Sequence, residues 1–331
     1  MPHYATKADK RKAAEAAFAY AQIERHNSDM TSVRATWTRY KAAFRGRYYE
    51  RAHEAAVQDG GALIDQNEDI TLESGSAILY GFVDTMLANV IPSNPAVDIH
   101  PLRAGLESQA EDRRQLLERV FDEVDVQSIL WHAAALTSVC GRSFVKCVWD
   151  SKKQMPKLRV IDPSAVFADL GAESWEDVRY VAEATVVTRG ELMRRIKRKG
   201  VAADRNESEG RYYPHDLDVK KIRFGKYPGW LTETESEDAG LKDAAEIARA
   251  GMEWVTVYEY YDFFAKKLYH FADGCTETLW CDDLPYKRAE NHYYLMTFDS
   301  NLKDLGGLGD AELVYPHLER MNELSTMRMH H

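Results

Sequence analysis

The sequence predicts an α+β fold, with helices through the first half of the chain, strands in its middle and a helix at its C-terminal end. Apolar residues recur at spacings of three and four up to about residue 141, and this spacing is typical of helices. From residue 142 they alternate with polar residues, as in strands. At 331 residues the chain is long enough for a sizeable core and for more than one domain.

These changes of pattern divide the chain into five consecutive segments. They are a mainly helical region (1–141), a strand-rich segment that ends in a Thr-capped helix (142–200), an irregular and mobile surface excursion (201–250), a β-rich segment (251–305), and a Gly turn with the start of a long helix (306–331). The excursion is predicted because its residues mix Gly, Pro and runs of charge without a regular apolar period.

Two helices are predicted before residue 60. Residues 7–27 are rich in Ala, Glu, Lys and Gln, and we expect Phe18 and Ile23 to lie on their sparse apolar stripe. Residues 31–57 carry apolar residues at spacings of four, three and four, which place them on one helical face: Val33, Trp37, Tyr40 and Phe44. Basic residues are expected on the other face: Arg34, Arg39, Lys41, Arg45 and Arg47. This pattern fits a nucleic-acid or anionic-partner surface, but an amphipathic helix with a solvated charged face is the simpler interpretation.

Three further helices complete the first segment. One is predicted over residues 73–91 and ends before Pro92, because the residue that precedes a proline disfavours the helical conformation. The next, over residues 104–125, is heavily charged on its exposed side. The last, over residues 126–140, ends at Gly141, and glycine is typical of helix C-terminal caps.

Strands are predicted from residue 142 onward. Residues 142–150 and 156–162 are expected to pair as a hairpin around the turn 151–155. Two further strand-like stretches follow, 165–169 and 178–187.

A capping box marks the end of the first group of strands. Thr188 is the expected N-cap, Glu191 is expected to reach back to it, and the helix that they open is expected to stop at Gly200. Beyond the surface excursion, strands return in two stretches: 253–280, with a hairpin turn at 272–274, and 291–299.

Five acidic residues lie close together in the middle of the chain and raise the question of a metal or acid–base site: Asp162, Asp169, Glu173, Glu176 and Asp177. Asp162 precedes Pro163, and Asp-Pro is a common turn-forming pair. Glu173, Glu176 and Asp177 flank a Trp in a connection that begins with Gly, where solvated acids are expected. We therefore expect solvated connectors here, while a metal-dependent nuclease that uses Asp162 and Asp169 remains the alternative.

Other chemical motifs are missing from the sequence. The four cysteines do not have the spacing of zinc-binding pairs, so buried structural thiols are expected. The scattered histidines form no HExxH motif, and no GxSxG elbow occurs. The sequence GGLG lacks the Lys-Ser/Thr of a phosphate-binding loop and predicts a turn into a helix. We accordingly expect no catalytic residue, no metal and no cofactor. We also expect that the protein is not an enzyme, although missing motifs alone do not exclude one, since a spatial site needs no local signature.

The helix predicted after Thr188 is the best candidate for contact with an anion or a partner. Its basic residues gather toward the C-terminal end, where cations also suit the helix dipole: Arg194, Arg195, Lys197, Arg198 and Lys199. The net charge of −10 nevertheless argues against a simple nucleic-acid clamp. The sequence also contains no apolar run of the roughly 18 to 20 residues that a membrane helix requires, so no membrane contact is expected.

Three stretches of the sequence carry a resemblance through their order and spacing. Residues 81–101 (GFVDTMLANVIPSNPAVDIHP) run from a helix into a Pro-containing extended piece. Residues 148–192 run from a strand through an Asp-Pro turn and another strand into a helix opened by Thr. Residues 284–326 run into the Gly turn and a helix with a Leu/Asn pattern. In this order they resemble the N-terminal part of the portal (head–tail connector) proteins of tailed double-stranded DNA bacteriophages, and the likeness covers residues 35–331.

The resemblance implies a ring of about a dozen copies of the chain, a dodecamer, at one capsid vertex, through whose channel double-stranded DNA is packaged and ejected. Most of the chain would form the outer wing. The helix after the Gly turn would begin the stem, with four candidate apolar positions: Leu313, Leu318, Met321 and Leu324. In the family a clip, a second stem helix and a crown follow this helix. They are not present before His331, so we expect either that the chain is truncated or that it departs from the family pattern.

The implied partners are the major capsid protein, the terminase packaging motor and the head-completion or tail adaptor proteins. The ring would assemble in the host cytoplasm and end in the virion. Its acidic charge suits a conduit, because a strongly basic lining would hold DNA phosphates. The aromatic stretch 255–264 would be part core and part subunit interface. Besides the nuclease, a virion adaptor or scaffold protein without a channel is an alternative.

Overall fold

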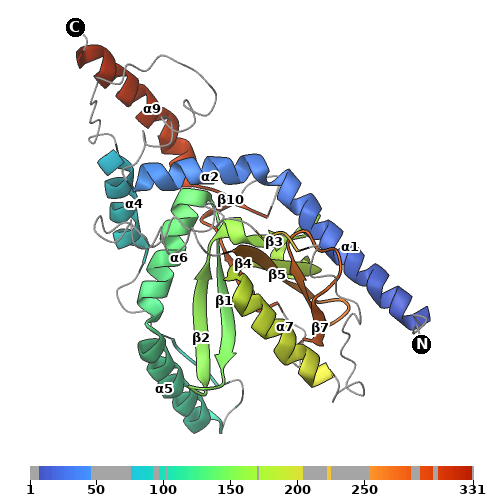
Figure 1. Cartoon of the computed structure of the whole chain (residues 1–331). Coiled ribbons are helices and arrows are strands. Elements are labelled where there is room, and N and C mark those ends of the chain that lie inside the picture. Colours follow the sequence, from blue (N-terminus) through green and yellow to red (C-terminus); the bar gives the residue numbers. More distant parts are fainter. Residues whose placement is uncertain are drawn as a thin grey trace, which may run out of the picture. The chain divides into compact units, whose positions relative to one another are not determined.

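The computed structural model describes ten stretches of the chain: residues 7–45, 76–91, 97–101, 103, 105–169, 171–203, 222–224, 253–284, 291–300 and 305–329. Helices and antiparallel sheets are both present, which confirms the α+β class (Figure 1). The chain divides into two compact units, each assembled from distant parts of the sequence. Unit 1 consists of Met1–Ser32 and Ser164–Asn291, and unit 2 of Val33–Pro163 and His292–His331.

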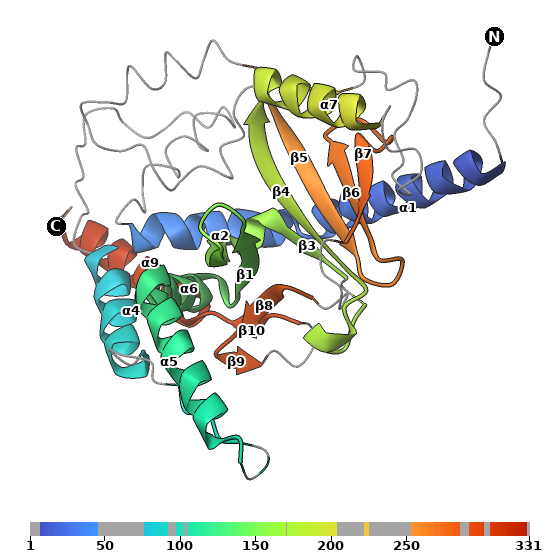
Figure 2. The same ribbon diagram turned by 90° about the horizontal axis from the view of Figure 1, so that it is seen from below.

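Unit 1 is built on a five-stranded antiparallel sheet in the order β3-β4-β5-β6-β7 (Figure 2). Its strands are β3 (Val166–Ala168), β4 (Tyr180–Thr188), β5 (Trp254–Asp262), β6 (Lys267–Ala272) and β7 (Trp280–Asp283). Single 3₁₀ turns, Pro163–Ala165 and Trp175–Asp177, precede β3 and β4. The strands predicted at 165–169, 178–187 and in 253–280 are therefore confirmed.

The turn between β5 and β6 was not predicted. It covers residues 263–266, whose sequence Phe-Phe-Ala-Lys contains no residue typical of turns, and Lys266 adopts the positive φ of 55° that Gly or Asn would favour. The turn that was predicted at 272–274 begins the connection from β6 to β7, and Gly274 there has a φ of 79°.

One face of this sheet packs against helix α1 (Lys7–Asp29) (Figure 2). The strand register places Ala182, Tyr260 and Tyr269 opposite one another on this face. They share a core with small and aromatic residues of α1: Ala16, Ala19, Tyr20 and Ile23. The prediction that Phe18 joins this stripe was wrong, since its side chain is 65% exposed. Phe18 and Ile23 are five residues apart, or about 140° around the helix, so they cannot share one face.

The opposite face of the sheet packs against helix α7 (Arg189–Ala203). Leu192 is buried there among Val187, Val255 and Val257. Thr188 caps the helix as predicted, because its Oγ1 accepts a hydrogen bond from the backbone N–H of Glu191 at 3.3 Å. The helix continues past Gly200, where it was expected to stop, to Ala203. A glycine inside a helix costs only about 1 kcal/mol relative to alanine, and it ends the helix only where the backbone turns left-handed.

Unit 2 combines helices with a three-stranded antiparallel sheet in the order β2-β1-β8. The helices are α2 (Thr31–Phe44, in this unit from Val33 onward), α4 (Ser76–Val90), α5 (Glu107–Val124), α6 (Val126–Cys140) and α9 (Asp310–Met329). The strands are β1 (Ser143–Asp150), β2 (Met155–Ile161) and β8 (Tyr293–Met296), with a small ladder of β9 (Asp299–Ser300) and β10 (Gly307–Leu308). The predicted hairpin is confirmed, because β1 and β2 pair antiparallel from Phe144↔Ile161 to Asp150↔Met155.

Helix α6 lies at the centre of unit 2, where it contacts α4, α9 and the strands β1, β2 and β8. Asp125 separates it from α5 with a φ of 54°, and the Asp125 side chain accepts a hydrogen bond from the Ser128 N–H at 3.3 Å. Gly141 ends α6 as predicted, with a φ of 78° and a hydrogen bond from its N–H to the Thr137 carbonyl at 2.7 Å.

The Gly-rich stretch before α9 packs directly on this end of α6. The Gly307 N–H donates to the Gly141 carbonyl at 3.1 Å. A Cβ on Gly309 would lie 2.8 Å from the Gly141 nitrogen, closer than real Cβ atoms come to backbone. The glycines are therefore required for close backbone approach.

Parts of two predicted segments lie outside the described residues. Residues 46–57 of the second predicted helix are among them. So is most of the predicted excursion 201–250, of which the structure describes the end of α7 and residues 222–224. Within that short piece, Ile222 is buried in the core beneath α7.

Candidate functional site

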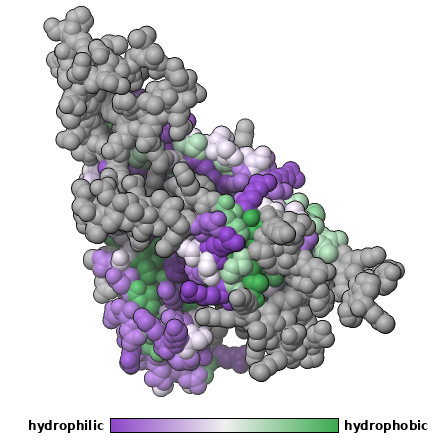
Figure 3. Space-filling model, in the orientation of Figure 1, coloured by the Kyte–Doolittle hydropathy of each residue, from purple (hydrophilic) through white to green (hydrophobic). Residues whose placement is uncertain are grey.

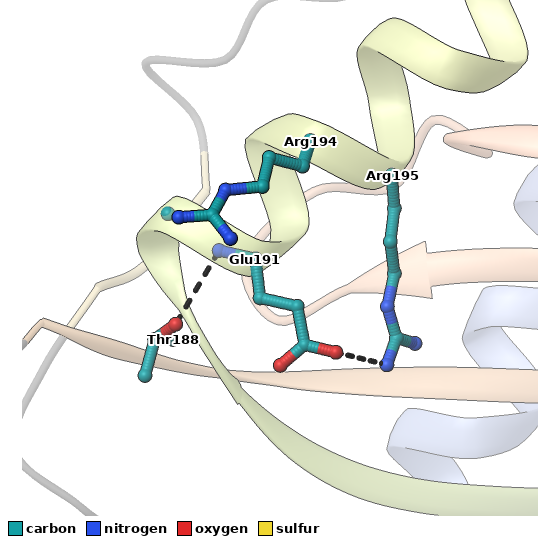
Figure 4. Close-up of a pocket in the computed structure, with 5 residues that line it drawn as sticks. Thr188, Glu191, Arg194 and Arg195 are labelled. Carbon is teal, nitrogen blue, oxygen red and sulfur yellow. Dashed lines mark hydrogen bonds and ion pairs between the residues drawn. The ribbon is translucent and has the colours of Figure 1, made fainter.

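The predicted basic helix α7 begins beside an open hollow in unit 1 (Figure 4). Thr188, Gly190 and Glu191 line it together with Arg194 and Arg195. Glu191 was predicted to reach back to Thr188 and complete a capping box. Instead, its carboxylate accepts a hydrogen bond from Arg195. Arg194 is exposed and turns back toward the first turn of the helix (Figure 4).

The other three basic residues of this candidate site, Lys197, Arg198 and Lys199, belong to α7, but their side chains lie outside what the structure describes. The described geometry thus brings Arg194 and Arg195 to one hollow at a helix N-terminus, where backbone N–H groups also favour anions. Contact of this helix with an anion or a partner stays a prediction.

Two of the five clustered acids are not solvated connectors. Asp162 binds the Lys41 ammonium group through both carboxylate oxygens, at 2.8 and 2.6 Å. Asp169 is buried and accepts the Arg179 Nε–H at 2.6 Å and the Gly171 N–H at 3.1 Å. A carboxylate that leaves water needs such partners, and the expectation was therefore wrong for these two residues. The other three are exposed, as expected: Glu173, Glu176 and Asp177.

The prediction that the basic residues of α2 lie on a solvent-exposed face was wrong for two of them. Arg34 and Lys41 are buried, whereas Arg39 and Arg45 are exposed. Lys41 finds its partner Asp162 at a separation of 121 residues, which periodicity along one helix cannot reveal. The long apolar stems of Lys and Arg side chains can also be buried, even on a helix face that the sequence predicts to be charged and exposed.

Replacement of Asp169 by Asn should flatten the acid limb of the stability curve. The Arg179 hydrogen bond is the main cause that holds the pKa of Asp169 below its usual value. The folded state therefore binds this proton more weakly than the unfolded state. The stability that results is present above the unfolded pKa of about 3.9 and is lost as pH falls through the lower folded pKa.

Urea denaturation of the wild type and of Asp169→Asn, from pH 7 to pH 3, measures this effect. The wild type should be more stable at pH 7, and the difference should shrink toward pH 3. Asp177→Asn, at an exposed position in the same connection, is the control and should follow the wild type. A constant difference between the wild type and Asp169→Asn would contradict the prediction.

The cysteines are mostly packed in the interior, as predicted. Cys140, Cys275 and Cys281 are buried, and Cys147 is half-buried; all four are free thiols. Burial raises the pKa of the Cys140 thiol to about 12, and Asp162 also raises it, while Lys41 lowers it. Cys140 is therefore a neutral packing residue at physiological pH.

A row of polar residues crosses the sheet of unit 1, and it was not predicted from the sequence. The register places Glu183 opposite Glu259, and Glu259 opposite His270. Glu183 and His270 are buried, the His270 ring stacks on Trp280 at 4.5 Å, and the Tyr261 hydroxyl donates to Glu259 at 3.0 Å. Polar residues at alternate positions of a strand usually predict a face in contact with solvent. Here the face that carries these polar residues is largely covered.

The candidate stem positions separate into two groups on α9. Leu318 is buried, whereas Leu313, Met321 and Leu324 are 58%, 51% and 65% exposed. The three exposed residues lie within about 80° of one another on the helix, so they form one uncovered apolar strip. We call these three residues the α9 strip.

Helix α4 leaves a second apolar surface uncovered. Leu79, Val83 and Leu87 are buried, but Ile78 and Phe82 on the adjoining side are exposed. Its only charged residue is Asp84. A helix that is apolar on almost all sides is normally buried on almost all sides. We call Ile78 and Phe82 the α4 patch.

Exposed apolar residues also occur on α5 and α6, among them Leu116 and Trp131. On the face shown in Figure 3, apolar surface gathers over α6 beside the hydrophilic surface of α5. Among the described residues, no helix is long and apolar enough to span a bilayer, and no three His, Cys, Asp or Glu residues are grouped as a metal ion would require. No protein-family model matches the chain, and no curated protein matches its sequence.

Proposed function

We propose that the chain is a portal subunit of a tailed double-stranded DNA bacteriophage. About twelve copies would form a ring at one capsid vertex, through which DNA is packaged and ejected. The observation that carries this proposal is the uncovered apolar surface of unit 2, on the α9 strip and the α4 patch. An ordinary monomer rarely leaves several such surfaces in water, whereas a ring subunit buries them against its neighbours.

A closed ring requires two different surfaces on each subunit, because each copy meets one neighbour on either side. The α9 strip and the α4 patch lie on two helices of unit 2 that contact each other, and in this proposal neighbouring subunits would cover them. The α9 strip consists of Leu and Met and the α4 patch of Ile and Phe. Met and Phe are among the residues enriched at subunit interfaces.

The order of elements also supports the proposal. The structure contains the helix before Pro92, the β1–β2 hairpin, the short strand after Asp162-Pro163, the Thr-capped helix α7 and the helix α9 after the Gly turn. These are the elements through which the sequence resembles portal proteins. In this proposal α9 begins the stem, and the remainder forms the wing.

The proposed role needs no catalysis by the chain. A separate terminase motor would supply the energy, and the capsid protein and tail adaptors would dock on the ring in the virion. The net charge of −10 suits a conduit for DNA, because the 53 Asp and Glu residues outnumber the 43 Lys and Arg residues and leave no net attraction for phosphates. Asp162 and Asp169, which a nuclease would use, are each engaged by a basic side chain.

Measurement of the assembled mass tests the proposal. We expect a particle of about 450 kDa, or about twelve chains of 37.8 kDa, in native mass spectrometry, and a ring with a central hole in negative-stain images. The double variant Leu313→Asp/Leu324→Asp should lose most of the ring without unfolding, because both side chains are exposed. Phe18→Asp, at a position of α1 in unit 1 that is 65% exposed and outside the proposed interfaces, is the matched control and should assemble like the wild type. A monomer or dimer that cleaves DNA with Mg²⁺ would refute the proposal.

A further inference from the structure

A polar pocket in unit 1 has no part in the function proposed above. It lies between α1 and the start of β4, and it has a volume of about 270 Å³. Gln22, Arg25 and Asp29 line it from α1, and Asp169, Arg179 and Tyr180 line it from the sheet side. A phosphate or carboxylate group, with part of the molecule that bears it, fits a volume several times that of one water molecule, which occupies about 30 Å³ in the liquid.

The Nε side of the Arg179 guanidinium group is held in this pocket by a hydrogen bond. Its Nε–H donates to the buried carboxylate of Asp169 at 2.6 Å, and the Gly171 N–H holds the other oxygen of that carboxylate at 3.1 Å. The two terminal amino groups of Arg179 make no hydrogen bond to any residue that the structure describes. A guanidinium group fixed in this way keeps a planar pair of donors for another partner.

Arg25 lies on the helix side of the pocket, in an ion pair with exposed side chains. Its Nε lies 3.8 Å from the Asp29 carboxylate one turn later, and within the described part of the chain its terminal amino groups are also unbonded. Gln22 adds a third donor, because its Oε1 accepts the Tyr180 hydroxyl at 3.4 Å while its amide NH₂ remains available. All three donors line the same pocket.

The frame that carries these donors is rigid. The His26 Nδ1 forms a hydrogen bond with the Ala168 carbonyl oxygen at 3.0 Å, and this bond joins α1 to the edge strand β3. The His26 ring also packs against the Phe167 ring, with 5.2 Å between the ring centroids. On the next turn toward the N-terminus, Ile23 is buried in the shared core. These contacts fix the backbone positions of the donors, while the Arg25 and Arg179 side chains themselves are 79% and 72% exposed and become ordered when a ligand binds.

We propose that this pocket binds an oxyanion, a phosphate or carboxylate group held by the terminal N–H groups of Arg25 and Arg179. The two arginines are balanced by Asp29 and Asp169, so binding would come from aligned donors and not from excess positive charge. Asp169 has both oxygens occupied, whereas Asp29 is half exposed and faces the anion as a repulsive charge. The inference does not depend on ring formation.

Titration calorimetry of the full-length protein with inorganic phosphate, and separately with acetate, at low ionic strength tests the proposal. Saturable binding of either anion is expected; a preference for phosphate indicates a phosphoryl ligand, and a preference for acetate indicates a carboxylate. Arg25→Gln and Arg179→Lys should each weaken binding about tenfold, which corresponds to the loss of one charge-assisted contact. Asp29→Asn should strengthen it, because the repulsive charge is removed.

Arg119→Gln is the matched control, since Arg119 and Glu123 form a similar exposed pair one turn apart on α5 in unit 2. It should bind like the wild type. If neither anion binds, or if Arg25→Gln and Arg179→Lys both bind as tightly as the wild type, the proposal is overturned. Opposite shifts for Arg25→Gln and Asp29→Asn would support it, and circular dichroism of each variant separates lost binding from lost folding.

Discussion

Replacement of Gly141 by alanine is expected to destabilise unit 2 by roughly 3 kcal/mol or more. Gly141 has a φ of 78°, a conformation that costs an L-residue about 1–2 kcal/mol. Its added Cβ would also lie 2.2 Å from the Gly307 carbonyl oxygen, which belongs to backbone and cannot rotate away. The displacement of the Gly turn from the end of α6 adds a cost of about 1–3 kcal/mol.

Hydrogen exchange of the α6 amides measures this loss within unit 2, and urea denaturation measures it for the whole chain. Gly81→Ala is the control in the same unit. Gly81 lies inside α4 with no atom within 4 Å of the added Cβ, so alanine there should stabilise by about 0.5–1 kcal/mol. Equal stability of the two variants would show that the end of α6 and the Gly turn do not pack as the structure has them.

Removal of the Asp162 charge is expected to cost about 2–3 kcal/mol. In Asp162→Asn the largely buried Lys41 ammonium group loses the charge of the carboxylate that binds it, and both of its short hydrogen bonds to Asp162 are weakened. In the double variant Lys41→Met/Asp162→Asn the cost should be smaller than the sum of the costs of Lys41→Met and Asp162→Asn, because both charges of the pair are removed together.

A double-mutant cycle by urea denaturation measures this coupling. The exposed pair of Arg119 and Glu123 is the control, and Glu123→Gln should change stability by less than about 0.5 kcal/mol. If Asp162→Asn costs no more than Glu123→Gln, the pair of Lys41 and Asp162 is not a buried element of unit 2. The same result would leave Asp162 open to the solvated role that the sequence suggested.

Local chemistry made several elements predictable. Pro92 marks the end of α4 within two residues, Gly141 caps α6, and Thr188 caps α7, because each effect depends on a few neighbouring backbone groups. The β1–β2 hairpin was predictable because alternation and a short polar turn specify it locally. The turn at 263–266 was not, since tertiary pairing of β5 with β6 forces a left-handed Lys266.

The candidate sites depended much more on contacts between distant residues. Arg194 and Arg195 were predicted because they are neighbours on one helix. The pocket with Arg25 and Arg179 was not, since its residues come from α1 and from the start of β4, about 150 positions later. The sequence likewise placed four apolar residues on α9 but could not show that Leu318 faces inward while Leu313, Met321 and Leu324 stay uncovered.

By itself, the sequence determined the α+β class, the order of the elements and the ends of several helices, because periodicity and capping act over a few residues. Only the tertiary structure decided which charges are buried. Lys41 meets Asp162 across 121 residues, and Arg179 meets Asp169 across a connection that looked solvated. Desolvation makes an unpaired charge costly, so its partner is chosen by packing between elements and not by neighbours in the chain.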